Sequence, residues 1–294
     1  MTIASTPFTY AEMTTRNRGF VSETEQARLR QACVFIPGVG GMGGAAFMAL
    51  VRAGVGRFII ADLDVFEVSN LNRQLFARAD TIGALKAEAA AQLALEINPE
   101  LEIEVLGREW TERLPDILPR ANVAINGTDD IAAGTEYYRQ CRDHGLTLID
   151  AYASPLPSVT VVRPDDPRLE ERLGYPTVGI AWQAITREMA AACLMKEIEY
   201  VLVHSSSHKY VDLEVAAEVA AGRRSRFSFA TMVTMAGTLM AEEAIRQILA
   251  RPGGTDFRGY FFNPHAQRVE RPLVAPLAFA KRILVRRLMT KLLS

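Results

Sequence analysis

The sequence predicts an α/β fold with a doubly wound, mostly parallel sheet, a helix-rich insertion and a C-terminal helical tail. Short apolar runs alternate with longer amphipathic segments from residue 22 to residue 150. A glycine-rich turn over residues 38–44 joins the first of these runs to the amphipathic segment that follows it. Strands and helices that alternate in this way build a parallel sheet with helices on both faces.

The first strand–helix–strand unit is predicted from its boundary residues. Ser22 is a suitable cap for the first helix, and Gly54 is a suitable stop for the second. Between these helices lies a short apolar run of the kind that forms a buried strand. The predicted elements are a helix over 22–31, a strand over 33–36, a helix over 45–53 and a strand over 57–61 that stops at Asp62.

The same alternation continues to residue 150, and the pattern then changes. A helix-rich stretch covers about residues 165–225, and a long helix ends at the Pro252-Gly253-Gly254 stop. The remaining predicted elements are a helix over 83–97, strands over 101–107 and 121–126, a helix over about 132–144, strands over 146–150 and 158–164, a helix over 229–250, a short strand pair in RGYFFNP and QRVERP, and a basic tail helix from Pro276.

Composition and charge set limits on function. At 294 residues, 49% hydrophobic and 23% charged, the chain can bury a large core. A net charge of -1 gives no global field that would favour nucleic acid, so we expect no nucleic-acid partner. Cys33, Cys141 and Cys193 are widely separated and form no CxxC pair, so we expect no zinc and a reducing cytoplasm. No secretory leader and no apolar run long enough to span a membrane are expected.

The glycine-rich turn predicts a phosphate site. Gly38, Gly40 and Gly43 have the G-x-G-x-x-G spacing between a strand and a helix, with Gly41 and Gly44 as additional glycines. Glycine lets the backbone turn with positive φ, and it lets a phosphate approach the amides at a helix N-terminus. The turn alone does not distinguish a dinucleotide from ATP, and a glycine turn without a ligand is the plainer alternative.

Two further features favour a triphosphate. Asp62 ends the second strand, 19 positions after Gly43, where an acid would accept hydrogen bonds from ribose hydroxyls of either NAD or ATP. SNLNRQLF should place Asn70, Arg73 and Gln74 on one short helix, and Lys86 lies near the start of the next helix. Arg73 and Lys86 would add two positive charges beyond the first phosphate, which suits a triphosphate better than a dinucleotide.

A carboxylate pair follows the fourth strand, at the same edge of the sheet. In GTDD, Asp129 is the predicted Mg²⁺ ligand between phosphate oxygens, and Asp130 is the predicted cap of the helix that begins near Ile131.

These motifs together resemble a known superfamily. GVGGMGG, ADLD, SNLNRQ, Lys86 and GTDD, in that order and spacing, resemble the adenylyltransferases related to the ubiquitin-activating enzymes. That superfamily includes the molybdopterin-synthase and thiamine sulfur-carrier adenylyltransferases. The resemblance covers about residues 10–160 and continues more faintly in FATMVTMAGTLMAEEAIRQIL.

The resemblance implies an activity and a set of site residues. It implies a homodimeric or pseudo-dimeric Rossmann-like fold that binds ATP and Mg²⁺ and adenylates the C-terminal carboxylate of a small protein or peptide, releasing pyrophosphate. An arginine ahead of the glycine turn would reach the γ-phosphate across the dimer, and Arg18 is preferred to Arg16. The motifs assign the ribose to Asp62, the phosphates to Asn70, Arg73 and Lys86, the metal to Asp129, and nucleotide contacts to Asp64, Gln74 and the glycines.

The chain departs from that pattern in one region. Many relatives carry two CxxC pairs that hold zinc, whereas residues 165–225 contain only Cys193, in an apolar helical setting typical of a core cysteine. We therefore expect a protein that stops at the acyl-adenylate, passes it to a separate nucleophile or uses it on the peptide itself, with an unusual acceptor. The predicted division is 1–164 for the N-terminal helices and nucleotide-binding part, 165–225 for the insertion, 226–275 for the closing helix and strands, and 276–294 for the tail.

Two further segments are interpreted by their surroundings. His204 and His208 have a spacing that can chelate metal on a helix, but the serines between them favour a solvated loop. The tail helix has an apolar arc that includes Lys281, with arginines on the other side. It could lie on an anionic membrane surface, dock on a partner or pack on its own domain, and the last is favoured.

Two other functions stay open. The glycine turn and Asp62 also permit an NAD-dependent oxidoreductase, although the sequence shows no evident acid for hydride transfer. A non-catalytic scaffold that keeps the nucleotide site is the third possibility.

Overall fold

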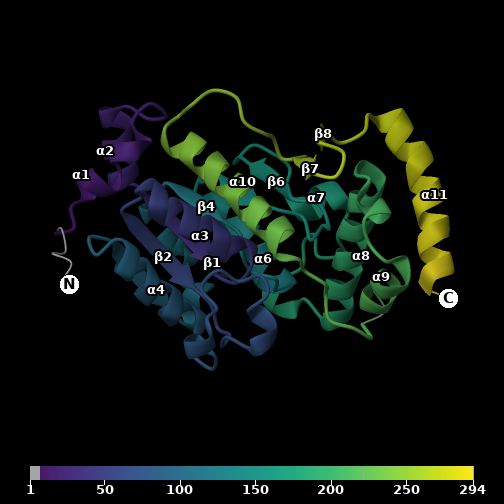
Figure 1. Ribbon diagram of the computed structural model, residues 1–294. Coiled ribbons are helices and arrows are strands. Elements are labelled where there is room, and N and C mark those ends of the chain that lie inside the picture. The colour runs from purple at the N-terminus through teal and green to yellow at the C-terminus, as the bar shows by residue number, and fades with distance from the viewer. Residues whose placement is uncertain (1–6, 221, 294) are drawn as a thin grey trace.

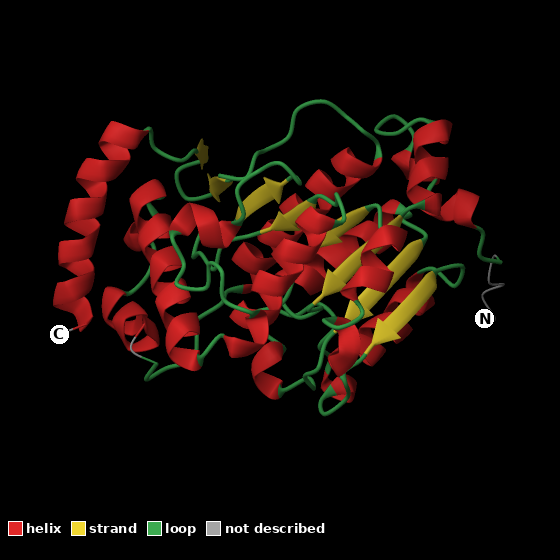
Figure 2. Ribbon diagram, turned by 180° about the vertical axis from the view of Figure 1, so that it is seen from behind, coloured by secondary structure: helices red, strands yellow, loops and turns green. Residues whose placement is uncertain are grey.

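The protein is built on one sheet of eight strands, in the order β3-β2-β1-β4-β5-β6-β7-β8. The computed structural model describes residues 7–220 and 222–293. Strands β3 to β5 pair in parallel, and β6, β7 and β8 add to the sheet antiparallel. Helices lie on both sides of the sheet, while α8, α9 and α11 stand together beyond its antiparallel end (Figures 1 and 2). The predicted fold class is confirmed.

The elements follow the predicted alternation along the chain. The strands are β1 (Cys33–Pro37), β2 (Arg57–Ala61), β3 (Glu102–Leu106), β4 (Val123–Ile125), β5 (Leu148–Asp150), β6 (Ser158–Val162), β7 (Tyr260–Asn263) and β8 (Arg268–Glu270). The α-helices are α1 (Tyr10–Met13), α2 (Glu23–Gln31), α3 (Met42–Ala53), α4 (Lys86–Ile97), α5 (Leu114–Ile117), α6 (Ile131–Asp143), α7 (Leu169–Leu173), α8 (Arg187–His204), α9 (Leu213–Ala220), α10 (Ala230–Ile248) and α11 (Ala275–Leu293).

The sheet separates two hydrophobic cores. Val34 and Ile36 of β1 point to the core beneath α3, α4 and α10, whereas Cys33 and Phe35 point to the core beneath α5 and α6. Successive side chains of a strand face opposite sides, so an unbroken apolar strand is expected where both faces are covered. Every residue of β1 is buried, which fixes the strand that carries the glycine turn at the centre of the fold.

One predicted helix does not form, and the predicted start of another is wrong. The segment SNLNRQLF does not form a helix, because only Val68–Asn70 is a 3-10 helix and turns follow it. There the Asn70 side chain accepts a hydrogen bond from the Glu67 N–H, and local side-chain bonds of this kind compete with helix. The helix predicted from residue 83 begins at Lys86, because Gly83 has a φ of 86°.

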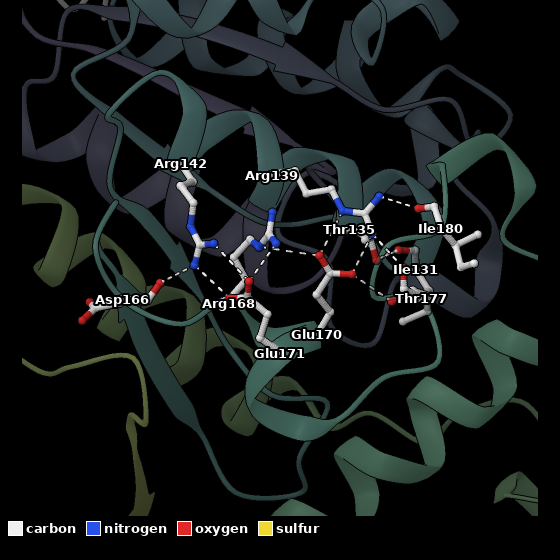
Figure 3. Close-up of polar contacts among 10 residues, drawn as sticks. All are labelled: Ile131, Thr135, Arg139, Arg142, Asp166, Arg168, Glu170, Glu171, Thr177 and Ile180. Carbon is white, nitrogen blue, oxygen red and sulfur yellow. Dashed lines mark hydrogen bonds and ion pairs between the residues drawn. The ribbon is translucent and has the colours of Figure 1, made fainter.

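The insertion is fixed to the sheet domain by an ion-pair network (Figure 3). Arg139 of α6 makes a bidentate contact with Glu170, with Nε–Oε1 and Nη2–Oε2 distances of 2.9 and 2.7 Å. The same guanidinium donates to the carbonyl oxygens of Thr177 and Ile180. One turn further along α6, Arg142 pairs with Glu171. These contacts hold α7 and the chain that follows it against α6.

The tail helix packs on the insertion, as the preferred prediction has it. Val285 and Ala278 of α11 are buried against Val203 of α8, and Arg286 forms an ion pair with Glu199. Lys281, which lies inside the apolar arc, donates to the carbonyl oxygen that follows α8, where a cation complements the helix dipole. Among the residues that the structure describes, no helix is long and apolar enough to cross a membrane.

Candidate nucleotide-binding site

A cavity of about 980 Å³ opens at the carboxyl ends of β1, β2 and β4, where ligands bind in doubly wound folds. Part of its wall comes from the sheet domain, and part from the insertion and the tail. The sheet-domain residues that line it include Gly38, Gly40, Gly41, Asp62, Asp64, Arg73, Gln74, Lys86, Arg108, Trp110, Asp129 and Asp130.

The glycines of the turn have two different roles. A Cβ on Gly43 would lie 1.9 Å from the carbonyl oxygen of Gly38, and a Cβ on Gly127 would lie 2.0 Å from the same atom. Gly38 itself has a φ of 86°. These three glycines therefore let the turn between β1 and α3 pack directly on the backbone after β4.

Gly40 and Gly41 face the cavity. A Cβ on Gly40 would meet only the end of the Gln74 side chain, at 3.3 Å, and one on Gly41 would meet Val233 at 3.0 Å. Gly41 also precedes the first turn of α3, where the N-terminal amides and the helix dipole favour an anion. The sequence assigned Gly38, Gly40, Gly41 and Gly43 to the nucleotide, and the structure places Gly43 in the packing contact.

Asp62 holds the glycine turn at the end of β2. Its Oδ2 accepts a hydrogen bond from the Val39 N–H at 2.9 Å, and its Oδ1 accepts one from the Asp64 N–H at 3.1 Å. Burial raises the pKa of this carboxyl, against these hydrogen bonds and the charge of Lys86. Each carboxylate oxygen has a second lone pair for a ligand hydroxyl.

The predicted cationic groups lie along the same wall. Lys86 is buried, and its ammonium nitrogen lies 2.8 Å from a carboxylate oxygen of Asp64, whose side chain is exposed. Arg73 lines the cavity and donates to the Ser69 carbonyl oxygen. Gln74 is buried, and its Oε1 has no hydrogen-bond partner among the described residues. An unpaired buried polar atom is costly and suggests that a ligand or water completes the site.

Asn70 lies apart from these groups. Its buried side chain closes the 3-10 turn through the Glu67 N–H, and it is not among the described residues that line the cavity. Its contact with phosphate stays a prediction.

The two aspartates after β4 have different surroundings, and the metal role of Asp129 stays a prediction. Asp130 is confirmed as the cap of α6, because its Oδ1 accepts hydrogen bonds from the amides of Ala132 and Ala133 at 2.8 and 3.1 Å. Asp129 is exposed and lines the cavity. Within residues 7–220 and 222–293, no group of three His, Cys, Asp or Glu side chains is arranged to hold a metal ion.

The N-terminal arginines are exposed and do not line the cavity of their own chain. Arg18 forms a surface ion pair with Glu23 at 2.7 Å. Arg16 lies in a 3-10 helix just before it. A contact of either arginine with nucleotide would therefore need a second copy of the chain.

A smaller pocket of about 130 Å³ adjoins the cavity, and the sequence did not reveal it. Three of its carboxyl groups, those of Asp150, Glu170 and Glu197, are buried. Asp150 accepts hydrogen bonds from Tyr138 and Asn126 at 2.6 and 3.0 Å, and burial raises its pKa. Burial raises the pKa of Glu197 to about 7, although the Ala153 N–H donates to its carboxylate. We call this the acidic pocket; its lining includes Asn126, Asp129, Tyr138, Asp150, Glu170, Tyr175, Glu197 and Arg226.

Glu197 could have been noticed from its spacing. It lies on α8 four residues after Cys193 and four before Val201, and all three side chains are buried. An acidic residue within such an apolar stripe indicates a buried carboxyl.

Cys193 lies in the core, as interpreted from its setting. Its side chain is buried, and burial raises the thiol pKa to about 11. A thiol of this kind is weakly nucleophilic at neutral pH.

The interpretation of the histidine segment as a solvated loop is wrong. His204 is the last residue of α8, and its buried ring accepts a hydrogen bond from the Leu273 N–H at 3.0 Å. Burial and the nearby cations of the tail lower its pKa to about 4. His208 lies in a separate 3-10 helix. The chain after β8 passes over this segment and covers it, which the sequence of the segment itself does not show.

The fold and the cavity thus define a doubly wound α/β protein with a cavity bordered by a glycine turn, the buried Lys86 and the partly exposed Arg73. Comparison with known proteins gives the family. The chain belongs to the ThiF family, which matches residues 14–280. The predicted resemblance to the ubiquitin-activating-like adenylyltransferases is confirmed.

Individual relatives match a part of the chain. The sulfur carrier protein ThiS adenylyltransferase of Escherichia coli (strain K12) is 34% identical over 129 residues, which is 44% of this chain and 51% of that protein. The tRNA threonylcarbamoyladenosine dehydratase of Haemophilus influenzae is 34% identical over 125 residues, 42% of this chain and 48% of that protein. The chain thus spans about half the length of these curated relatives.

Solved structures share the fold over more of the chain. Escherichia coli MccB with ATP has a TM-score of 0.60 at 18% identity and covers 84% of this chain and 65% of its own. Escherichia coli TcdA in complex with AMP has a TM-score of 0.59 at 19% identity, covering 84% of this chain and 99% of its own. At these identities the similarity concerns the fold.

Proposed function

We propose that the protein is an ATP- and Mg²⁺-dependent adenylyltransferase that activates the C-terminal carboxylate of a small protein or peptide and releases pyrophosphate. The observation that carries the proposal is the arrangement of one cavity wall. It combines the N-terminus of α3, the Asp62 carboxylate, and the cations of Arg73 and Lys86. The family supports the same activity, since the matched relatives include adenylyltransferases of sulfur-carrier proteins.

The cavity suits a nucleoside triphosphate in its charge and its unfilled hydrogen bonds. The amides of the α3 N-terminus and the ammonium of Lys86 supply positive potential for phosphate oxygens. Asp62 has free lone pairs for ribose hydroxyls. The unpaired Oε1 of Gln74 can accept a hydrogen bond from a donor on the ligand. On binding, the phosphates would compete with Asp64 for Lys86, which is held by that single carboxylate in the described structure.

Mg²⁺ fits beside Asp129. Magnesium is commonly bound by one or two carboxylates together with substrate phosphates, so a single exposed aspartate at the cavity suits it. The ion would neutralise charge on the leaving pyrophosphate.

The proposed reaction needs no strong general base. A peptide carboxylate is already ionised at neutral pH, and the barrier comes from two anions meeting at the α-phosphorus and from charge on the leaving group. Arg73, Lys86 and the α3 amides reduce both effects by electrostatic stabilisation.

We also propose a homodimer, located in the cytoplasm. Exposed apolar side chains gather on the segment 63–85, which borders the cavity, and a second copy would cover them. An arginine of that copy, Arg18 by preference, would complete the phosphate site. The free cysteines of the described residues suit a reducing compartment. The exposed apolar residues of the segment are Leu63, Val65, Val68, Leu71, Leu75, Ile82 and Leu85.

ATP–pyrophosphate exchange with candidate peptides and small carrier proteins tests the activity. We expect Lys86→Ala and Arg73→Ala to lower exchange by at least about 100-fold with the fold intact, since each removes a charge that stabilises the transition state. Arg78→Ala is the control, because Arg78 is exposed and pairs with Asp80 away from the cavity. Wild-type exchange in either cavity variant would contradict the assigned roles, and tight NAD binding without ATP binding would favour an oxidoreductase.

A further inference from the structure

The part of the cavity far from the glycine turn is walled by helices outside the sheet domain. Helices α8, α9 and α11 contribute this wall, and α11 packs on both of the others. Figure 1 shows the three helices side by side at one end of the molecule. We call this part the apolar chamber; its lining includes Leu194, Met195, Ile198, Val201, Leu202, Leu213, Ala216, Ala217, Val219, Leu288 and Met289.

The apolar chamber is packed at one side, where Leu202 of α8 and Met289 of α11 lie against the cluster around Val203, and its other apolar side chains line open space. Leu194, Met195 and Ile198 lie on consecutive turns of α8 and are only partly buried. Facing them, Ala216 of α9 and Met289 of α11 line the same space. Apolar side chains normally fill such spaces at crystal-like density, so a lined but unfilled chamber is a place for an apolar ligand group.

The whole cavity extends beyond the residues assigned to the nucleotide. Pockets for one small molecule measure about 300–1,000 Å³. At about 980 Å³ the cavity is at the upper end of that range, and the nucleotide residues occupy only its sheet-domain side. The chamber is continuous with this side, so a group bound there can reach the nucleotide.

A cation, Arg226, lies between the apolar chamber and the sheet-domain side of the cavity. Arg226 lines both the cavity and the acidic pocket. Its side chain is exposed, its charge acts on the buried Glu197 carboxyl, and within the described ranges no carboxylate lies within ion-pair distance of its guanidinium. Asp129 lines the same junction. A carboxylate entering from the chamber would therefore meet a free arginine beside the expected position of the phosphates.

Polar groups at the rim distinguish among apolar carboxylic acids. Ser207, His208 and Ser225 line the cavity near the chamber. These three side chains can form hydrogen bonds with peptide N–H and C=O groups, which need such partners when they leave water. An alkyl chain has no group that could use these hydrogen bonds.

We propose that the apolar chamber binds the C-terminal residues of a peptide substrate and selects bulky aliphatic side chains there rather than glycines. This proposal rests on the proposed function and names the substrate class of the same site. Glycines would leave the aliphatic wall of α8, α9 and α11 without contacts, and each methylene in such a pocket changes discrimination about 10- to 200-fold. Arg226 receives the terminal carboxylate and orients it toward the α-phosphate.

The test is peptide binding to the full chain, with a non-hydrolysable ATP analogue present. Two fluorescein-labelled hexapeptides share their first four residues and end in Ile-Leu or Gly-Gly, and fluorescence anisotropy gives the Kd of each. We expect the aliphatic peptide to bind at least about 10-fold more tightly. Equal affinities would overturn the proposal, as would tighter binding of decanoate, used as a competitor, than of the unlabelled aliphatic peptide.

Variants locate the binding. Ile198→Trp and Leu288→Trp fill the chamber from opposite walls, and each should weaken the aliphatic peptide at least about 10-fold while calorimetric ATP binding is unchanged. Ala192→Trp is the control, because Ala192 is exposed on the same helix as Ile198. Wild-type affinity in a folded chamber variant would contradict the assignment. If both variants unfold, the difference in Kd between the two peptides on wild-type protein still tests whether aliphatic side chains are selected.

The two proposals fail separately. Aliphatic-selective binding without any ATP–pyrophosphate exchange would refute adenylation and leave the chamber assignment standing. Exchange with a Gly-Gly peptide at the same kcat/KM as with the aliphatic peptide would refute the chamber assignment alone.

Discussion

Glu197 should make the protein less stable as the pH rises from acid to neutral. Its carboxyl is buried, and its pKa is raised from 4.5 in the unfolded chain to about 7, with burial as the main cause. The hydrogen bond from the Ala153 N–H and the charges of Arg226 and Arg172 lower this pKa, whereas the Asp150 carboxyl raises it further. Between these two pH values the folded protein therefore binds more protons than the unfolded chain, so its stability falls with pH.

The magnitude follows from the shift. Each pKa unit is about 1.4 kcal/mol, so the change from 4.5 to about 7 amounts to roughly 3 kcal/mol in total. About 2 kcal/mol of that falls between pH 5.5 and pH 8. Glu197→Gln removes the titration and keeps an oxygen that accepts from the Ala153 N–H. The variant should thus gain about 2 kcal/mol relative to wild type across this range.

Urea unfolding at pH 5.5, 6.5, 7.5 and 8.5 measures the effect. Glu188→Gln is the matched control on the same helix, because the Glu188 carboxyl is exposed and its pKa is lowered, so it is ionised in both states throughout this range. The free energy of unfolding of Glu188→Gln should fall with pH as steeply as that of wild type. In Glu197→Gln it should fall less steeply, and some dependence should remain because the pKa of the buried Asp150 is also raised. If wild type and Glu197→Gln lost stability in parallel, the buried neutral carboxyl would be ruled out.

Three other changes have defined outcomes. Gly43→Ala should lower the free energy of unfolding by about 1–3 kcal/mol or more in urea titrations, because the new Cβ would lie 1.9 Å from a carbonyl oxygen. Arg139→Leu should cost about 3–5 kcal/mol in the same assay, because it removes the bidentate partner of the buried Glu170 carboxylate and leaves it the more distant Arg168, at 3.6 Å (Figure 3). Cys193, whose thiol is buried with a pKa of about 11, should react with iodoacetamide at pH 7.5 much more slowly in native protein than in urea, as followed by mass spectrometry.

Matched variants separate these mechanisms from general damage. Gly40→Ala should leave the free energy of unfolding within about 0.5 kcal/mol of wild type, because its Cβ meets only a flexible side-chain end at 3.3 Å. Arg78→Ala removes an exposed ion pair and should cost at most about 1 kcal/mol. Equal losses for Gly40→Ala and Gly43→Ala would contradict the packing role, and equal losses for Arg78→Ala and Arg139→Leu would contradict the role of the buried pair. Alkylation of native Cys193 at the rate seen in urea would show that the thiol is accessible.

The parts of the fold that local sequence determines were predicted well. The α2–β1–α3–β2 segment depends on the serine that caps α2, on apolar runs and on the glycines at both ends of α3, and all of these signals lie next to the elements they define. Asp130 is a cap because of its neighbours, and this too was predictable. The family resemblance came from motifs of the same local kind.

The remaining features depend on contacts between distant segments. Gly43 looked like a phosphate residue, but its role is set by Gly38 and by Gly127, which follows another strand. His204 looked exposed, but the chain near Leu273 covers it. The acidic pocket and the apolar chamber arise where α8 meets the sheet domain and α11, and no single segment of sequence contains both sides.

Isothermal titration calorimetry with ATP and Mg²⁺ tests the central claim, which is that the cavity beside the glycine turn holds a triphosphate. Wild-type protein should release or absorb heat with one nucleotide per chain, and Lys86→Ala should weaken the affinity by at least about 10-fold, because a buried ammonium is lost from the phosphate site. Gly40→Val, which would fill the cavity side of the turn, should bind more weakly still. Absence of heat with ATP and Mg²⁺, together with tight binding of NAD under the same conditions, would contradict the claim.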